Sequence, residues 1–318
     1  MKASCFASLF ALLAALLAGA AIAQDYPAKP IRIIVGPGPD VLARIIGQQL
    51  TDAWGQQVLV EQRPGAGGII AAESVAKSAP DGYTLLLSTG TYTTIPSLYS
   101  KVPYDFVKDL QPVTLLATLP FLLVAHPSLP AKSVQDLLGL ARARPGRLNY
   151  ASSGNGTTAH LAGEMLKSMA KINIVHVPYK GTVPGVTDLV AGQVDVMFAI
   201  IQSSLPYVKA GRLRALGVSS AKRTSSAPEV PTIAESGVPG YEFISWNGIH
   251  APAAASKAVT GKLSAELLKV IARPDVKERM FGLGMDVAGG TPESFGVLVK
   301  SDIAKWAKVI REAGIKVE

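Results

Sequence analysis

The chain of 318 residues contains a single cysteine, Cys5. Cys5 lies in an N-terminal segment with a basic start at Lys2, an apolar run to Ile22 and a small-residue exit at 21–23, the pattern of a secretory signal peptide. We therefore predict a signal peptide over residues 1–23, cleavage after Ala23 and a location in the periplasm. The mature chain then has no thiol, which excludes disulfides, thiolate nucleophiles and cysteine metal sites.

An uncleaved membrane anchor is the alternative, because the apolar run approaches the length of a spanning helix. Gly19 and the Ala-rich end of the run favour cleavage instead. Removal of the segment leaves a chain whose stability depends on a packed core.

Clustered charge is also missing. Charged residues make up 17% of the chain, and its formal net charge is +8. The basic residues are scattered, with Lys222-Arg223 as the only adjacent pair, so no stripe could follow a phosphate backbone. We therefore expect no nucleic-acid partner, whereas a diffuse positive field would attract small anions.

Catalytic and metal-binding patterns are equally scarce. The four histidines are far apart in sequence, without metal-ligand spacing, and no Gly-x-Ser-x-Gly elbow occurs. We expect the histidines to be structural, with no catalytic residue, no metal and no cofactor. A secreted serine hydrolase that uses Ser153 is kept as an alternative.

Short β-branched runs alternate with amphipathic segments along the mature chain, which predicts an α/β fold with parallel sheets and helices on both faces. The first helix is expected to begin at Asp40, which would cap it. Strands are predicted over 31–35, 58–61, 83–87, 121–125, 148–151, 174–177 and 194–198, and helices over 40–50, 70–77, 134–142, 158–169, 185–191, 258–271 and 292–313.

Two such α/β units predict two domains. The first comprises residues 24–122 together with 222–318, because the Pro-rich stretch after residue 222 is typical of a return crossing rather than a third domain. The second comprises residues 123–221. A hinge between them leaves a cleft, which is the default ligand site because strand ends and helix starts converge there.

The strongest local signal is the loop 152–158, between a predicted strand and a predicted helix. It combines hydroxyls, an amide and glycines at a helix N-terminus, whose free N–H groups attract an anion such as a carboxylate. The alternative is an ordinary helix start capped by Asn155 or Thr157.

Two further loops are expected at the same cleft. The loop 89–94 offers hydroxyls, and its Tyr92 could wall off an apolar part of a ligand. The loop 36–39 is too short, and lacks the lysine, for a phosphate-binding P-loop.

Several segments, taken in order, resemble one family, the Bug family of extracytoplasmic solute receptors of tripartite tricarboxylate transporters. The resemblance covers essentially the whole mature chain. It is carried by Tyr26-Pro27-x-Lys29-Pro30-Ile31, Arg63-Pro64-Gly65-Ala66-Gly67-Gly68, Ala79-Pro80-Asp81-Gly82-Tyr83-Thr84-Leu85, Pro103-Tyr104-Asp105, Ser152-Ser153-Gly154-Asn155-Gly156-Thr157, Val177-Pro178-Tyr179-Lys180-Gly181 and Pro228-x-Val230-Pro231-Thr232.

The resemblance implies a type II periplasmic binding protein, a monomer that closes around a small carboxylate and delivers it to membrane permease subunits. The ligand would be a di- or tricarboxylate, an acidic amino acid or an aromatic acid. Carried onto this chain, the binding role falls to Gly38, Thr91, Tyr92, Ser153, Asn155, Gly156, Thr157 and Thr158. An orphan receptor that signals to a sensor partner is the alternative.

The chain also departs from the family pattern. Its loop after the first strand, 36–39, is shorter than is usual in the family, Ala199 stands where aspartate is common, and Ile95 stands where asparagine is frequent. Loss of polar groups at these positions would favour a less polar ligand, such as an aromatic acid, or weaken binding altogether.

Overall fold

The computed structural model describes residues 26–36 and 40–315. The predicted signal peptide and Gly38 lie outside these ranges. Within them, no helix combines the length and the apolar character needed to cross a membrane.

The described strands form one mixed sheet in the order β2-β1-β3-β9-β4-β7-β5-β6, with β8 and β10 also paired to β4. The strands are β1 Ile31–Val35, β2 Val58–Gln62, β3 Thr84–Thr89, β4 Leu110–Ala125, β5 Asn149–Ser152, β6 Val175–Pro178, β7 Val196–Ile200, β8 Arg214–Val218, β9 Ile244–Pro252 and β10 Asp286–Val287.

Helices flank both parts of this sheet. They are α2 Val41–Trp54, α3 Ile69–Ala76, α4 Ile95–Leu98, α5 Val134–Ala143, α6 Thr158–Ala170, α7 Thr182–Val190, α8 Ile201–Lys209, α9 Lys257–Ala272, α10 Pro274–Gly282 and α11 Pro292–Ala313, with short 3-10 turns η1 Ala66–Gly68 and η2 Gly90–Thr93. We call β1–β3, α2–α4 and α9–α11 the first half, and β5–β8 with α5–α8 the second half.

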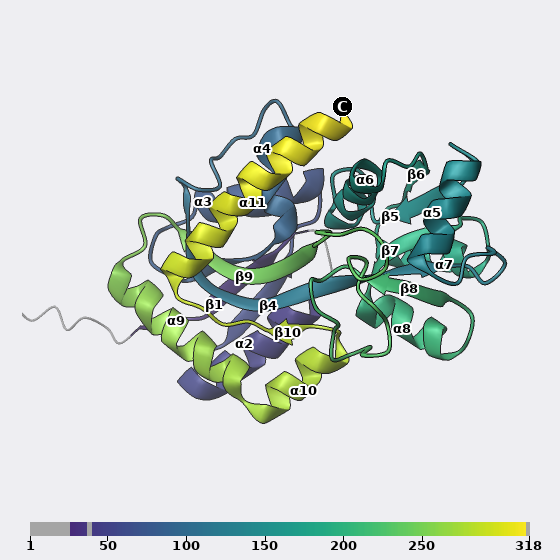
Figure 1. Cartoon of the computed structure of the whole chain (residues 1–318). Helices are drawn as coiled ribbons and strands as arrows, with labels where there is room; N and C mark the ends of the chain where they lie inside the picture. The colour runs from purple at the N-terminus through teal and green to yellow at the C-terminus, as the bar shows by residue number, and fades with distance from the viewer. Residues whose placement is uncertain (1–25, 37–39, 316–318) are drawn as a thin grey trace, which may run out of the picture.

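The long strand β4 joins the two halves. It pairs with β9 up to Pro120 and with β7 from Phe121 onward. Figure 1 shows β4 running between the purple and yellow elements of the first half and the teal and green elements of the second. The strand is therefore shared by the two parts of the sheet.

The prediction of parallel sheets holds only at the outer strands. β2-β1-β3 and β7-β5-β6 are parallel, whereas β9 lies antiparallel between β3 and β4. The chain comes back from the second half through β9, and hydrophobic periodicity does not reveal which gap in a sheet a returning strand fills.

Most predicted elements are confirmed to within a few residues, but the strand predicted over 121–125 begins already at Leu110, and two helix details differ. Asp40 is the N-cap residue of α2, but its side chain accepts no hydrogen bond from the helix backbone. Its carboxylate instead accepts from the guanidinium of Arg44 at 2.6 Å. α8 was missed, because Pro206 within it reads as a helix breaker. The elements β8, β9, β10, α4 and α10 were also missed.

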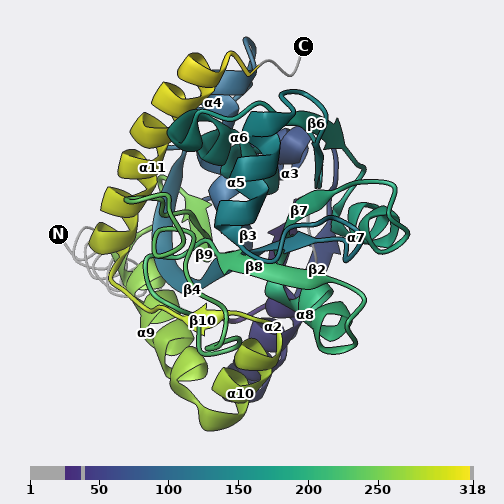
Figure 2. The same cartoon turned by 45° about the vertical axis from the view of Figure 1, so that its right-hand side comes forward.

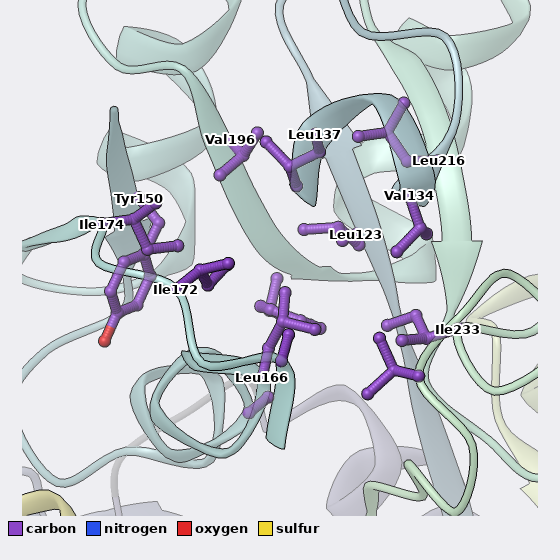
Figure 3. Close-up of a cluster of buried hydrophobic side chains, with 14 of the residues drawn as sticks. Leu123, Val134, Leu137, Tyr150, Leu166, Ile172, Ile174, Val196, Leu216 and Ile233 are labelled. Atoms are coloured by element: carbon purple, nitrogen blue, oxygen red, sulfur yellow. The ribbon is translucent and has the colours of Figure 1, made fainter. Parts of the chain in front are cut away.

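The hydrophobic core of the second half extends past residue 221, where the second domain was predicted to end. Ile233 packs with Val134 and Leu123 in that core, and Figure 3 labels all three in one cluster. α11 contributes Trp306 to this core and Phe295 to a core of the first half. Figure 2 shows α11 running up one side of the molecule toward α4 and α6, so the exact division into domains stays a prediction.

Candidate functional site

A cavity of about 500 Å³ lies between the two halves, and both contribute to its lining. The first half supplies strand ends, the loop 89–94 and the start of α2, and the second half supplies the loops 153–158 and 180–184. Of the predicted binding residues, the cavity brings together Thr91, Ser153, Asn155, Gly156, Thr157 and Thr158.

The start of α6 is open toward this cavity. Thr157 is the N-cap residue, but its side chain makes no cap bond, because its Oγ1 donates to the carbonyl oxygen of Gly154 at 2.8 Å. Within the described residues, the N–H groups of Thr158 and Ala159 donate to no acceptor. The expected alternative, a helix start capped by a side chain, is therefore not what the structure adopts, and free donors remain for an anion.

The loop that leads into α6 depends on left-handed backbone conformations. Gly154 and Gly156 have φ values of 136° and 72°, a region that side chains other than hydrogen disfavour. The N–H of Gly156 donates to Nδ1 of His160 at 3.0 Å. Gly156 therefore lines the cavity with its backbone donor already used.

Two of the histidines, which are far apart in sequence, lie together in the structure. His160 and His176 stack with ring centroids 3.8 Å apart, and Nε2 of His176 lies 2.6 Å from Oγ of Ser152. Burial lowers the pKa of His160 to about 4 and that of His176 to about 3, so both rings are neutral at neutral pH. This pair supports the loop from behind, since neither ring lines the cavity.

A buried carboxylate completes the support behind the loop. Glu164 accepts from the hydroxyl of Tyr150 at 2.6 Å and from Nζ of Lys167 at 2.7 Å. Burial, and then the charge of Glu164, raise the pKa of Tyr150 far above its usual value, so the phenol stays protonated. Because every member of this cluster has a partner, it holds α6 and β5 in one arrangement.

On the first-half wall, most hydroxyl groups are satisfied locally, whereas that of Thr91 has no hydrogen-bond partner among the described residues. Thr89 Oγ1 accepts from the N–H of Thr91 at 3.3 Å, and Thr93 Oγ1 donates to the carbonyl of Gly90 at 2.7 Å. Thr94 Oγ1 donates both to Thr91 at 2.8 Å and across the cavity to the carbonyl of Gly156 at 3.2 Å. This wall is therefore largely closed on itself.

The prediction that Tyr92 walls off the ligand is not matched by its position. Tyr92 is fully buried, is absent from the cavity lining, and stacks on Phe106 with ring centroids 5.4 Å apart. Within the 3-10 turn η2, Thr91 faces the cavity, while the side chain of Tyr92 packs in the core of the first half. Residue type alone does not indicate which way a side chain in such a turn points.

Lys180 is a lining residue that the sequence reasoning did not select. It is the one charged side chain among the described residues that line the cavity, and it is exposed. The sequence did contain an indication of its role, since Lys180 belongs to the segment 177–181 that carries the family resemblance. Thr89 and Thr94, of the loop expected at the cleft, also line the cavity, and the polar lining residues that were missed are Thr182, Gln202, Ser245 and Asn247.

Other helices also begin at the cavity. α7 starts at Thr182, has neither a side-chain cap nor an acidic residue in its first turn, and its first residues line the cavity. α2 and α8 start beside it as well, at Val41 and near Gln202. Several partial positive charges are thus directed at one space.

The positions at which this chain departs from the family pattern are buried to different degrees. Ile95 lines the cavity and replaces a polar wall by an apolar one. Ala199 is fully buried in the second half, and the lining residue next to it is Ile200. Gly38 and the shortened loop lie outside the described residues.

The hydrolase alternative gains no support from the geometry. Ser153 Oγ donates to Thr157 Oγ1 at 3.1 Å, and it is Ser152, with no exposed surface, that contacts a histidine. Among the described residues, no three His, Cys, Asp or Glu side chains are arranged to hold a metal ion.

Comparison with known proteins points to one family. Residues 42–315 match the family described as the tripartite tricarboxylate transporter family receptor. BugT of Bordetella pertussis is 36% identical over 304 residues, which cover 93% of each chain. A solved structure from R. palustris with adipate has a TM-score of 0.86 at 36% identity, covering 92% of this chain and all of that one. MatC from Rhodopseudomonas palustris with bound malate has a TM-score of 0.79 at 31% identity, covering 90% of this chain and all of MatC.

Proposed function

Because the chain belongs to the receptor family of tripartite tricarboxylate transporters, together with the Bug proteins, we propose that it binds a small carboxylate in the periplasm and delivers it to a membrane permease. The family consists of extracytoplasmic solute-binding proteins, and the fold is that of a periplasmic binding protein. The predicted signal peptide supports export of this chain.

The open start of α6 is the observation that carries the proposal. The N–H groups of Thr158 and Ala159 are free, and Thr158 lines a cavity whose lining includes further hydroxyls and one lysine. Such a helix start favours an anion through both hydrogen bonds and the helix dipole. A carboxylate satisfies these donors with two oxygens.

Two relatives support the ligand class. The R. palustris structure contains adipate, and MatC contains malate, and both ligands are carboxylates.

Thermal-shift measurements on residues 24–318 test the proposal. A panel of aliphatic, aromatic and amino-substituted carboxylic acids should contain at least one acid that raises the melting temperature in a concentration-dependent way. An alcohol and an amine of the same carbon skeleton should give no shift. A flat response to every acid would contradict carboxylate binding.

A matched pair of variants then tests the site. Thr157→Val removes the hydroxyl that links Ser153 to Gly154, and we expect it to abolish the shift. Thr187→Val serves as the control, because its hydroxyl bonds only to Val183 within α7 and its side chain lies outside the cavity lining. Full binding by Thr157→Val would show that the carboxylate binds at another site.

Delivery to a permease needs a cellular test. A strain that lacks this gene should lose uptake of the acid found in the panel. Normal uptake together with lost gene induction would instead identify a receptor that signals to a sensor partner.

A further inference from the structure

Charge and free donors are concentrated on the second-half wall of the cavity. The open starts of α6 and α7 lie there, as does Lys180, the one charged lining side chain among the described residues. One carboxylate placed against this wall meets N–H donors, hydroxyls and a cation.

The remainder of the lining is mainly apolar. Leu119, Phe121 and Ile200 lie along the central strands of the sheet, and Leu42, Leu283 and Met285 lie nearby on the first half. Neutral polar side chains interrupt this surface, namely Asn247 and Ser245, which are 8% exposed, together with Gln202, Thr89, Thr91 and Thr94. They suit a neutral polar substituent and supply no charge to a second carboxylate.

The start of α2 could in principle receive a second anion, but it already has one. Asp40 sits at its N-cap position, and its carboxylate, 17% exposed, is held by Arg44 at 2.6 Å. A ligand carboxylate at this helix start would meet a like charge. α2 therefore differs from α6 and α7, whose N-cap residues, Thr157 and Gly181, are uncharged.

The start of α8 is covered by the first half. Gly284 packs so closely on it that an added Cβ would lie 2.5 Å from Cβ of Ile201 and 3.3 Å from the backbone nitrogen of Gln202. The neighbouring Leu283 and Met285 line the cavity at this place. The start of α8 is thus packed against apolar side chains of the first half, and Gln202 is the polar side chain that it contributes to the lining.

From this asymmetry we propose that the site takes a monocarboxylate with an apolar body and discriminates against dicarboxylates of the same length. The carboxylate lies on the open starts of α6 and α7, and the aliphatic or aromatic body lies against Leu119, Phe121, Ile200 and Leu283. Among the described lining residues, a second carboxylate in that position would meet neutral side chains and no cation, so it would lose its hydration for weaker partners. This inference rests on the proposed carboxylate-binding function.

Paired ligands test the inference by calorimetry on residues 24–318. Hexanoate is compared with adipate, and 4-methylbenzoate with terephthalate, so that each pair differs at the end remote from the first carboxylate. We expect the monocarboxylate of at least one pair to bind, and to bind at least tenfold more tightly than its partner. Dicarboxylates that bind as tightly or more tightly would overturn the inference while leaving the carboxylate receptor intact. If no carboxylate of a broad panel binds, the proposed function fails and this inference fails with it.

A variant pair locates the discrimination. Leu283→Arg places a cation in the apolar region, and we expect it to lower the preference for hexanoate over adipate at least fivefold. Phe281→Arg is the control, since Phe281 is 47% exposed and lies outside the cavity lining. An unchanged ratio in a folded Leu283→Arg protein would show that the ligand body lies elsewhere. Should that variant fail to fold, the ligand pairs on the unaltered protein still decide the question.

Discussion

Two hydroxyl-rich loops meet at the cavity and differ in what they leave free. In the first half, the loop 89–94 bonds to itself: Thr89 accepts from the N–H of Thr91, and Thr93 donates to Gly90. In the second half, the hydroxyl of Thr157 also turns back into its loop, but this leaves the N–H groups at the start of α6 without partners. Both loops carry several hydroxyls, but the free N–H groups of the second loop lie at the start of a long helix.

The helix that follows each loop amplifies the difference. α4 has four residues, whereas α6 has 13, so only α6 aligns enough peptide dipoles to attract an anion strongly. Between them, Thr94 donates to the carbonyl of Gly156 and links the two loops. An anion site thus needs a long helix whose first turn is left uncapped, and hydroxyl-rich composition alone does not provide one.

The largest expected effect comes from closing the open loop. Thr157→Asp supplies both a capping oxygen and a negative charge at the start of α6. We expect carboxylate affinity to fall at least about 100-fold, or roughly 3 kcal/mol, while thermal stability stays equal or rises by about 1 kcal/mol. Calorimetry and thermal melts measure the two quantities separately.

Ser133→Asp is the matched control for that change. Ser133 already caps α5 by accepting from the N–H of Asp136, and it lies outside the cavity lining. This variant should bind normally. Equal losses in both variants would mean that overall charge, and not the open helix start, governs affinity.

The contrast between the loops was only partly predictable from the sequence. Strand-loop-helix order and the loop 152–158 follow from hydrophobic period and small residues, because both are local properties. The insertion of β9, the stacking of His160 on His176 and the burial of Tyr92 depend on residues far apart in the chain. The position of Lys180 at the cavity depends on the parallel pairing of β6 with β5, which places the segments after both strands at the same edge of the sheet.

A second prediction concerns the stability of the protein at low pH. It depends on His160, which is neutral at neutral pH and lies behind the second-half loop. Its folded pKa of about 4 lies below the ordinary value of 6.5, so the unfolded chain binds more protons between these pH values. His160 therefore contributes stability above pH 6.5, which is lost as the pH falls through 4. Urea unfolding at several pH values should show a fall in the free energy of unfolding across this window.

His160→Gln isolates that contribution. Glutamine can still accept from the N–H of Gly156 but does not titrate. We expect binding at neutral pH to persist and the pH slope to become shallower by at most about 1.4 kcal/mol per pH unit. Identical slopes for the two proteins would remove His160 as a source of acid sensitivity.

A smaller effect is expected at Lys180. The side chain is exposed, so its attraction for a carboxylate is screened by water and salt. Lys180→Met should weaken binding about threefold at low ionic strength, close to 0.6 kcal/mol, and the loss should shrink in high salt. Lys209→Met, at the far end of α8, is the control, and a loss that does not depend on salt would indicate a direct bond instead.

The smallest effect should come from the closed side, at Tyr92→Phe. The hydroxyl of Tyr92 has no hydrogen-bond partner among the described residues, and the ring keeps its stacking on Phe106 when the oxygen is removed. We expect stability to change by less than about 1 kcal/mol and carboxylate affinity to stay the same, because the deletion leaves no buried group newly unpaired. Thermal melts measure the stability and calorimetry measures the carboxylate affinity, with Thr157→Val analysed in parallel for comparison. A tenfold loss of affinity in Tyr92→Phe would place this side chain in the binding site, and the two loops would then contribute alike.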